Sequence, residues 1–118
     1  MIAAGNLFAA LVDAALADAA LADAGGAERI ETLAAAAGAR VERIVSMGQV
    51  SPEGFWYDQE RIEFVALLAG SARLRVEDEA APRDLGPGDW LVLPAHCRHR
   101  VEATSRAPAA VWLAVYVG

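Results

Sequence analysis

Gly86-Pro-Gly-Asp-Trp-Leu-Val-Leu-Pro-Ala-His-Cys-Arg-His-Arg-Val101 is the stretch of sequence on which the fold prediction rests. Its Gly-Pro-Gly-Asp opening is typical of a tight turn, and the apolar run Trp90 to Leu93 predicts a short strand that Pro94 ends. A further strand is expected to follow. Both histidines of the chain, His96 and His99, lie in this one segment. Imidazoles at strand ends can bind a metal ion or transfer protons near neutral pH.

From Ala39 onward, apolar and polar residues alternate and turn residues recur at short intervals, as in an all-β protein. The expected strands cover residues 41–46, 62–69, 72–76, 90–93, 98–104 and 109–117. Short strands at this close spacing, mostly antiparallel, indicate a sandwich or a small barrel. The interior of so small a barrel holds packed side chains or one small ligand. Trp90 and Trp112 are expected to pack in the core or against a sheet.

The composition changes near residue 39, because the preceding part of the chain is dominated by alanine. Apolar residues from Leu7 to Leu16 keep helical spacing, which predicts one helix there. A second helix is expected over Ala27 to Ala37, since its apolar residues share a face and Gly38 suits the position after a helix end. The predicted organisation is an alanine-rich helical arm at 1–38 and a β-barrel at 39–118.

Composition excludes several classes of protein. The 118 residues fit one domain, and the net charge is −6 with all ten basic residues arginine. No basic stripe stands out, so a nucleic-acid partner is not expected. Asp13 and Asp18 interrupt the apolar N-terminal stretch, and its start lacks a positively charged region, so neither a membrane span nor a signal peptide is expected. The single cysteine, Cys97, rules out an internal disulfide, and the expected location is the cytoplasm.

Glu63 is the most unusual residue of the β region, because apolar residues flank it on both sides. By the two-residue period of a strand it shares a face with Val65 and Leu67. A carboxylate there must be paired, protonated or bound to a metal. If its strand and that of His99 line one cavity, the two side chains can meet. A metal site and a simple hydrogen-bonded core pair are both compatible with this pattern.

The spacing from Glu63 to Gly70, and from Gly88 through Pro94 to His99, resembles the two sequence motifs of the cupin family. These motifs read G-x5-H-x-H-x3-4-E-x6-G and G-x5-P-x-G-x2-H-x3-N, and the resemblance covers about residues 40–117. It is similar in particular to small single-domain bacterial cupins. The resemblance implies a double-stranded β-helix, which is a jelly-roll barrel, and pairing into homodimers by strand addition. It also implies Glu63 and His99 as metal ligands.

The chain departs from the family motifs at several positions. The H-x-H pair of the first motif falls at Trp56 and Asp58 or at Tyr57 and Gln59, and neither choice supplies a histidine. In the second motif, His96 stands at the usual glycine and Ala103 at the usual asparagine. On chemical grounds Asp58, Gln59 and His96 are the candidate substitute ligands. A site of this kind has mixed nitrogen and oxygen ligands, which suits Zn, Fe(II), Mn or Ni.

Three functional hypotheses follow. In the first, a divalent metal held by Glu63 and His99 serves an enzyme of unresolved reaction class that acts on a small polar metabolite. Tyr57 and Cys97 are its candidate catalytic residues, the latter if its neighbours lower the thiol pKa. In the second, the barrel is a non-catalytic sensor of a metabolite or metal. In the third, Glu63 and His99 satisfy only each other and the barrel is purely structural.

Overall fold

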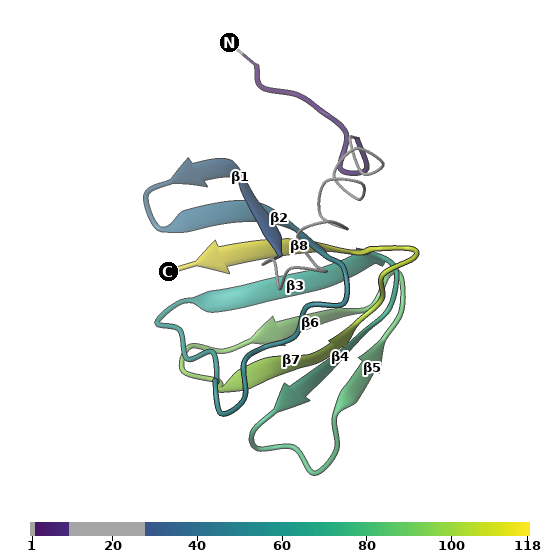
Figure 1. Ribbon diagram of the computed structural model, residues 1–118. Coiled ribbons are helices and arrows are strands. Elements are labelled where there is room, and N and C mark those ends of the chain that lie inside the picture. Colours follow the sequence, from purple (N-terminus) through teal and green to yellow (C-terminus); the bar gives the residue numbers. More distant parts are fainter. Residues whose placement is uncertain (1, 10–27) are drawn as a thin grey trace.

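A computed structural model describes residues 2–9 and 28–118 of the chain, and these described residues form eight strands (Figure 1). The strands are β1 (Arg29–Ala36), β2 (Ala39–Ser46), β3 (Ile62–Ala69), β4 (Ala72–Val76), β5 (Arg83–Leu85), β6 (Trp90–Leu93), β7 (His99–Thr104) and β8 (Ala110–Val117). The described residues contain no helix. The all-β class and the strands expected in the second half of the chain are therefore confirmed.

The strands form two antiparallel sheets that face each other. One has five strands in the order β1-β2-β8-β3-β6, and the other has three in the order β5-β4-β7. Neighbours such as β8 and β3 are far apart in sequence, so the chain crosses repeatedly between the sheets (Figure 1). This two-sheet arrangement is that of a jelly roll. Among the described residues, no helix is long and apolar enough to cross a membrane.

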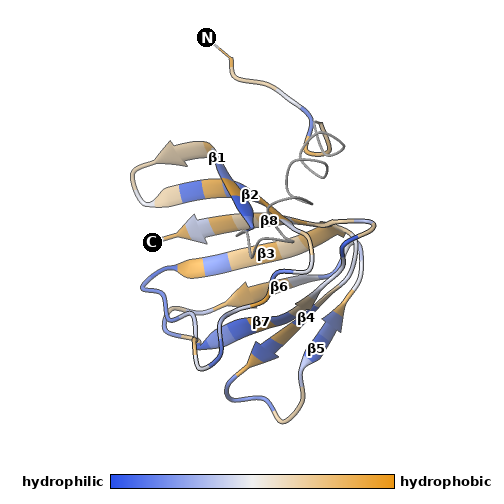
Figure 2. Ribbon diagram, in the orientation of Figure 1, coloured by the Kyte–Doolittle hydropathy of each residue, from blue (hydrophilic) through white to orange (hydrophobic). Residues whose placement is uncertain are grey.

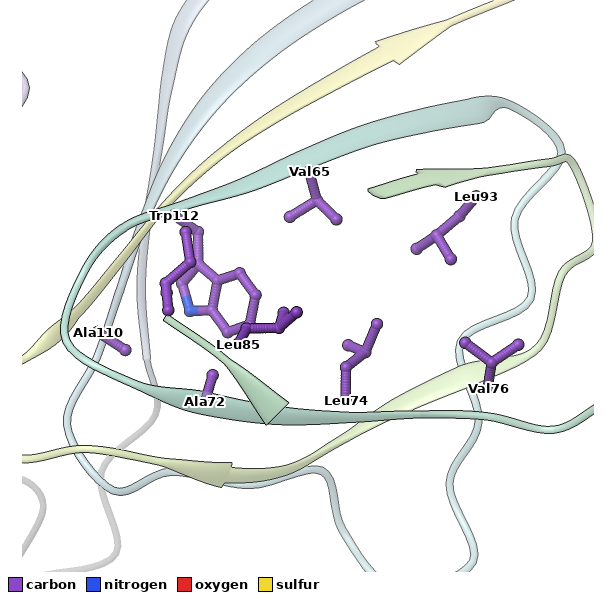
Figure 3. Close-up of a cluster of buried hydrophobic side chains, with 9 residues drawn as sticks. Val65, Ala72, Leu74, Val76, Leu85, Leu93, Ala110 and Trp112 are labelled. Carbon is purple, nitrogen blue, oxygen red and sulfur yellow. The ribbon is translucent and has the colours of Figure 1, made fainter. Parts of the chain in front are cut away.

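The hydrophobic core lies between the two sheets. Figure 3 shows Val65 of β3 and Leu93 of β6 pointing toward Leu74 and Val76 of β4, with Trp112 of β8 at one end of the cluster. Each of these five side chains is buried. Alternate residues of β3, including the fully buried Leu67, point into this layer, which confirms the face predicted from the two-residue period.

The N-terminal part differs from the sequence prediction. The helix expected over Ala27 to Ala37 is wrong, because β1 occupies Arg29–Ala36 and pairs antiparallel with β2 along its length. Gly38, with φ of 76°, forms the turn of this hairpin instead of ending a helix. Alanine favours helices only by a few tenths of a kcal/mol per residue, so an available strand partner overrides it. The other expected helix falls mostly on residues 10–27, outside the described residues.

The outer face of the five-stranded sheet is apolar toward its β6 edge. Figure 2 shows strongly hydrophobic residues along β3 and β6, whereas β5 and β7 are largely hydrophilic. Trp90 is 61% exposed and stacks on Phe64, with ring centroids 5.7 Å apart. Of the two expected positions, Trp90 thus packs against the sheet, whereas Trp112 lies in the core. The alternation within β6 places Trp90 on the opposite face from the buried Leu93.

Candidate functional site

A small cavity opens inside the barrel at one end of the core, and its volume is about 90 Å³. Polar and aromatic side chains from both sheets and from the loop before β3 line it: Glu28, Glu42, Tyr57, Gln59, Glu63, His99, Trp112 and Tyr116. Apolar residues complete the wall: Ile30, Ile44, Val65, Leu74 and Val101. One water takes about 30 Å³ of liquid, so this space suits a few waters or one small chemical group.

Glu63 and His99 meet at this cavity, as the sequence predicted they would if their strands shared it. They are 6% and 5% exposed, and His99 Nε2 lies 3.5 Å from Glu63 Oε1. That separation is longer than a normal hydrogen bond, and Glu63 Oε1 has no hydrogen-bond partner within the described residues. His99 Nδ1 lies 2.8 Å from the Cys97 carbonyl oxygen and donates to it, which directs Nε2 toward the cavity.

The surroundings of His99 favour its protonated form. Burial alone would lower the pKa of the imidazole, but the Glu63 carboxylate and the Cys97 carbonyl oxygen act in the opposite direction. Their combined effect prevails, so the pKa of His99 is raised above its ordinary value. His99 is therefore the member of this pair whose imidazole is favoured to carry a proton.

Two tyrosines stand beside this pair. The Tyr57 ring stacks on His99 with centroids 5.3 Å apart, and two backbone hydrogen bonds join these residues. Burial raises the pKa of Tyr57, and the nearby carboxylates Glu28 and Glu63 raise it further. Burial likewise raises the pKa of Tyr116, with Glu63 adding to the effect. Both phenols consequently stay protonated and can donate hydrogen bonds into the cavity.

Of the three substitute ligands proposed from the sequence, only Gln59 lines the cavity. Asp58 and His96 are exposed and bind each other instead, with His96 Nδ1 2.8 Å from Asp58 Oδ1. The His96 backbone is in the left-handed region, with φ of 62°, at the position where the family motif has glycine. Its amide donates to the Gln59 carbonyl oxygen at 2.6 Å, so this residue fastens the loop that carries Gln59.

Cys97 does not have the environment of a reactive thiolate. Burial raises the pKa of its thiol, and the carboxylates of Asp78 and Glu79 raise it further. The arginines that follow in the sequence contact other groups: Arg98 pairs with Glu77, and Arg100 donates to backbone carbonyl oxygens. The side chain packs against the hydrophobic core and is not among the cavity-lining residues. The condition for a catalytic Cys97, a lowered thiol pKa, is therefore not met.

Sequence reasoning missed three polar residues of the cavity: Glu28, Glu42 and Tyr116. Glu42 shares its strand face with Ile44 and Ser46, so the two-residue period that singled out Glu63 also applied to it. Tyr116 pairs directly with Glu63 across β8 and β3. No local signal marks Glu28, because it enters the cavity only through the pairing of β1 with β2.

The donor set fits a divalent ion only in part. Glu63 Oε1 and His99 Nε2 are 3.5 Å apart, a separation that two ligands of one ion at roughly 2 Å can adopt. The orphaned oxygen of Glu63 is available to such an ion. Within residues 2–9 and 28–118, however, no group of three or more histidine, cysteine, aspartate or glutamate side chains is arranged to hold a metal. Gln59 is the neutral oxygen donor that could complete the set.

Comparisons with known proteins place this fold in a family. A crystal structure of a "putative mannose-6-phosphate isomerase" from Ralstonia eutropha JMP134 is 42% identical, with 98% of each chain covered and a TM-score of 0.83. A cupin superfamily protein from Desulfitobacterium hafniense DCB-2 is 20% identical, with 77% of each chain covered and a TM-score of 0.65. An RmlC-like cupin with a double-stranded β-helix fold from Methanocaldococcus jannaschii is 15% identical, covering 77% of this chain and 80% of that one, with a TM-score of 0.63.

The last two likenesses concern the fold, whereas the first extends over the whole sequence. No curated protein matches the chain. The cupin domain family matches residues 44–116, which contain both Glu63 and His99. Together with the jelly-roll topology, this match shows that the chain belongs to the cupin family.

Proposed function

We propose that the protein binds a small polar metabolite in the barrel cavity and that Glu63 and His99 form the polar centre that contacts it. The observation that carries this proposal is the buried Glu63 oxygen, which faces the cavity without a hydrogen-bond partner among the described residues. A buried carboxylate oxygen left in this state costs free energy that a bound ligand or ion can recover. A purely structural pair would instead be expected to use this oxygen in a normal hydrogen bond.

A divalent metal is part of the proposal. Glu63, His99 and Gln59 would hold it, with the Cys97 carbonyl fixing the orientation of the imidazole through Nδ1. When bound, the ion would supply Lewis-acid or oxygen-activating chemistry. As ligands, Glu63 would be ionised and His99 neutral, and the Tyr57 phenol would contribute hydrogen-bond donation beside them. Zn, Fe(II), Mn and Ni all accept such mixed ligands.

A non-catalytic sensor is the second candidate. It is favoured by the pairing of Asp58 with His96 outside the cavity, because Glu63 and His99 are then the only ionisable residues of the predicted ligand set that line it, whereas the family's usual pattern has four ligands. Turnover assays separate the two only when the substrate is known. Measurements of metal and ligand binding test both candidates, because an enzyme and a sensor both require a bound metal or ligand in the cavity.

Metal analysis of protein purified without an affinity tag tests the proposal. We expect about one divalent ion per chain in the wild type and loss of this ion in Glu63→Gln and in His99→Ala. Asp58→Asn serves as the matched control and should keep the ion, because Asp58 does not line the cavity. Loss in Asp58→Asn would return Asp58 and His96 to the ligand set. A wild type that carries no metal and refuses added Zn, Mn, Fe and Ni would sink the metal proposal.

We also propose that the chain forms a homodimer. β1 and β6 are the edges of the five-stranded sheet, and such edges are open to strand addition. The β6 edge carries the exposed apolar residues Trp90 and Val92, which contact with a second copy would cover.

A further inference from the structure

The barrel cavity has a buried floor and an exposed apolar rim. At the floor, Glu63, His99 and Trp112 are 6%, 5% and 4% exposed. Ile30 lines the same cavity but is 54% exposed, so the cavity opens to solvent beside the start of β1. Tyr57 lies between these two levels, because it lines the cavity and is only half-buried. A ligand that reaches the floor therefore passes an apolar side chain at the surface.

A row of rings leads from the floor of the cavity to the surface. The Tyr57 ring stacks on His99 with centroids 5.3 Å apart, and Phe55 meets Tyr57 edge-on with centroids 4.9 Å apart. Phe55 is 43% exposed, although burial of a phenyl ring is favourable. The three rings thus form a continuous aromatic surface from the buried imidazole to solvent.

The turn that carries Phe55 is held in place by Arg100. Its guanidinium donates to three backbone carbonyl oxygens of the turn, each at 3.2 Å: those of Ser51, Pro52 and Phe55. The Phe55 amide donates to the Pro52 carbonyl oxygen at 3.0 Å, which closes the turn. An exposed ring fixed in this way loses little conformational entropy when a ligand covers it. Rigid aromatic side chains of this kind are used as anchors at binding surfaces.

The size and the charges of the cavity define the part of a ligand that enters it. Its volume of about 90 Å³ holds only a few non-hydrogen atoms, whereas a pocket that encloses a whole drug-sized ligand has roughly 300–1,000 Å³. Each carboxylate of the wall already lies beside a polar group: Glu63 beside His99, Glu42 beside Arg40, and Glu28 beside Ser46. A hydroxyl group meets such a wall without adding a charge, because it both donates and accepts hydrogen bonds.

We propose that the ligand is amphipathic: a neutral, hydroxyl-bearing head of a few atoms enters the cavity, and an aromatic tail lies outside it on Ile30 and Phe55. These two residues then determine specificity for the tail, and Arg100 is a positioning residue that acts through Phe55. The inference rests on the proposed function and narrows it, since it takes the barrel cavity as the binding site. The head can bond to Glu63 and His99 themselves or to an ion that they hold.

Calorimetric titration of the protein as purified with two matched probes tests the inference. Ethane-1,2-diol supplies the head alone, and 1-phenylethane-1,2-diol supplies the same head with an aromatic tail. We expect the phenyl probe to bind at least about tenfold more tightly, because burying a ring against apolar and aromatic side chains contributes that much.

Variants locate the head and the tail separately. Glu63→Gln should weaken both probes, whereas Phe55→Ala should remove most of the gain from the tail and leave affinity for ethane-1,2-diol unchanged. Arg100→Gln should act like Phe55→Ala, since a general loss of structure would weaken both probes alike. Phe8→Ala is the matched control and should keep the full gain, because Phe8 is 49% exposed and does not line the cavity. Thermal melting of each variant confirms that it is folded.

The outcomes separate this inference from the proposed function. Equal affinities for the two probes, or a full gain retained in Phe55→Ala, would overturn the inference, while Glu63-dependent binding of ethane-1,2-diol would still support the proposed function. Mannose 6-phosphate, the sugar phosphate in the name of the Ralstonia eutropha relative, has no apolar tail. Tighter binding of it than of the phenyl probe would also overturn the inference. If neither probe binds, the inference fails, and if metal analysis then finds no Glu63-dependent ion, the proposed function fails with it.

Discussion

At the scale of single residues, the site shows how neighbours set the chemistry of a side chain. Glu63 and His99 are both buried, yet neither is held in a tight hydrogen bond to the other. His99 is oriented from behind by the Cys97 carbonyl and flanked by the Tyr57 ring. The result is a buried pair with one carboxylate oxygen and one imidazole nitrogen at the cavity.

The raised pKa of His99 predicts a pH dependence of stability. A group whose pKa is higher in the folded than in the unfolded protein stabilises the fold fully below its unfolded pKa, about 6.5, and loses that contribution as pH rises through the folded value. The free energy of unfolding of the wild type stripped of metal with a chelator should therefore decline above about pH 6.5. In Glu63→Gln, burial still lowers the pKa of His99 and the main opposing group is gone, so the decline should shrink or reverse.

Urea denaturation at a series of pH values measures this effect. Glu53→Gln is the matched control and should follow the wild type, because its exposed carboxylate is not among the groups that shift the pKa of His99. Parallel curves for the wild type and Glu63→Gln would contradict the coupling of Glu63 to His99.

At the scale of elements, glycines fix the turns between strands. Gly70, between β3 and β4, has φ of 78°, and a Cβ built there would lie 2.5 Å from the Ala109 carbonyl oxygen and 2.8 Å from Ala110 Cα. Gly38, between β1 and β2, has a similar φ of 76° but open space around it. An added methyl group would therefore cause only backbone strain at Gly38, but both backbone strain and steric overlap at Gly70.

Gly70→Ala should destabilise the protein by about 2–4 kcal/mol. This loss adds the cost of placing alanine in the left-handed conformation to the cost of a steric overlap with backbone atoms that cannot move aside. Gly38→Ala carries only the conformational cost of about 1–2 kcal/mol. Denaturant unfolding of both variants against the wild type is the measurement. Equal losses at the two positions would mean that the backbone at Ala109 yields to the added methyl group.

The hairpin that carries Glu28 into the cavity should be less stable than the sheet centre. β1 and β8 both have eight residues, but β1 is an edge strand with mostly exposed side chains, whereas β8 lies between β2 and β3 and is largely buried. Local unfolding of an edge strand with few buried side chains costs less free energy than unfolding of a buried central strand. Hydrogen exchange should therefore be faster in Arg29–Ala36 than in Ala110–Val117, and equal protection of the two strands would contradict this.

At the scale of the whole molecule, one sheet face remains to be covered. Trp90 and Val92 are 61% and 51% exposed at the β6 edge, beside the partly exposed Phe64. Exposed apolar patches of this kind mark interaction surfaces. The proposed homodimer would bury this patch and leave the cavity on the opposite face of the sheet.

Light scattering coupled to gel filtration tests the dimer. The wild type should elute with twice the 12.4 kDa mass of one chain, and Trp90→Arg should shift it to the mass of a single chain. Val50→Arg is the matched control, because Val50 is similarly exposed at 52% but lies outside the strands, and it should remain dimeric. A wild type with the mass of one chain, or a Trp90→Arg variant that stays dimeric, would reject this interface.

The all-β class, most of the strands, and the inward face of β3 that carries Glu63, Val65 and Leu67 can be predicted from the sequence. These features are local, because a strand's two-residue alternation and a turn's need for glycine can be read from neighbouring residues. The same alternation predicted that Glu63 and His99 would meet if their strands lined one cavity, and they do so from different sheets.

Features that depend on partners distant in sequence could not be predicted and follow from the three-dimensional contacts. Pairing with β2 makes residues 29–36 a strand despite their alanine content, and it delivers Glu28 to the cavity. Asp58 and His96 bind each other outside the cavity, so their ligand-like chemistry does not reach its interior. Trp90 is exposed because β6 turns Leu93 inward. In each case the deciding contact joins residues that are not neighbours in sequence, so the alternation of neighbouring residues does not reveal it. These contacts set which side chains are buried and which charges face the cavity.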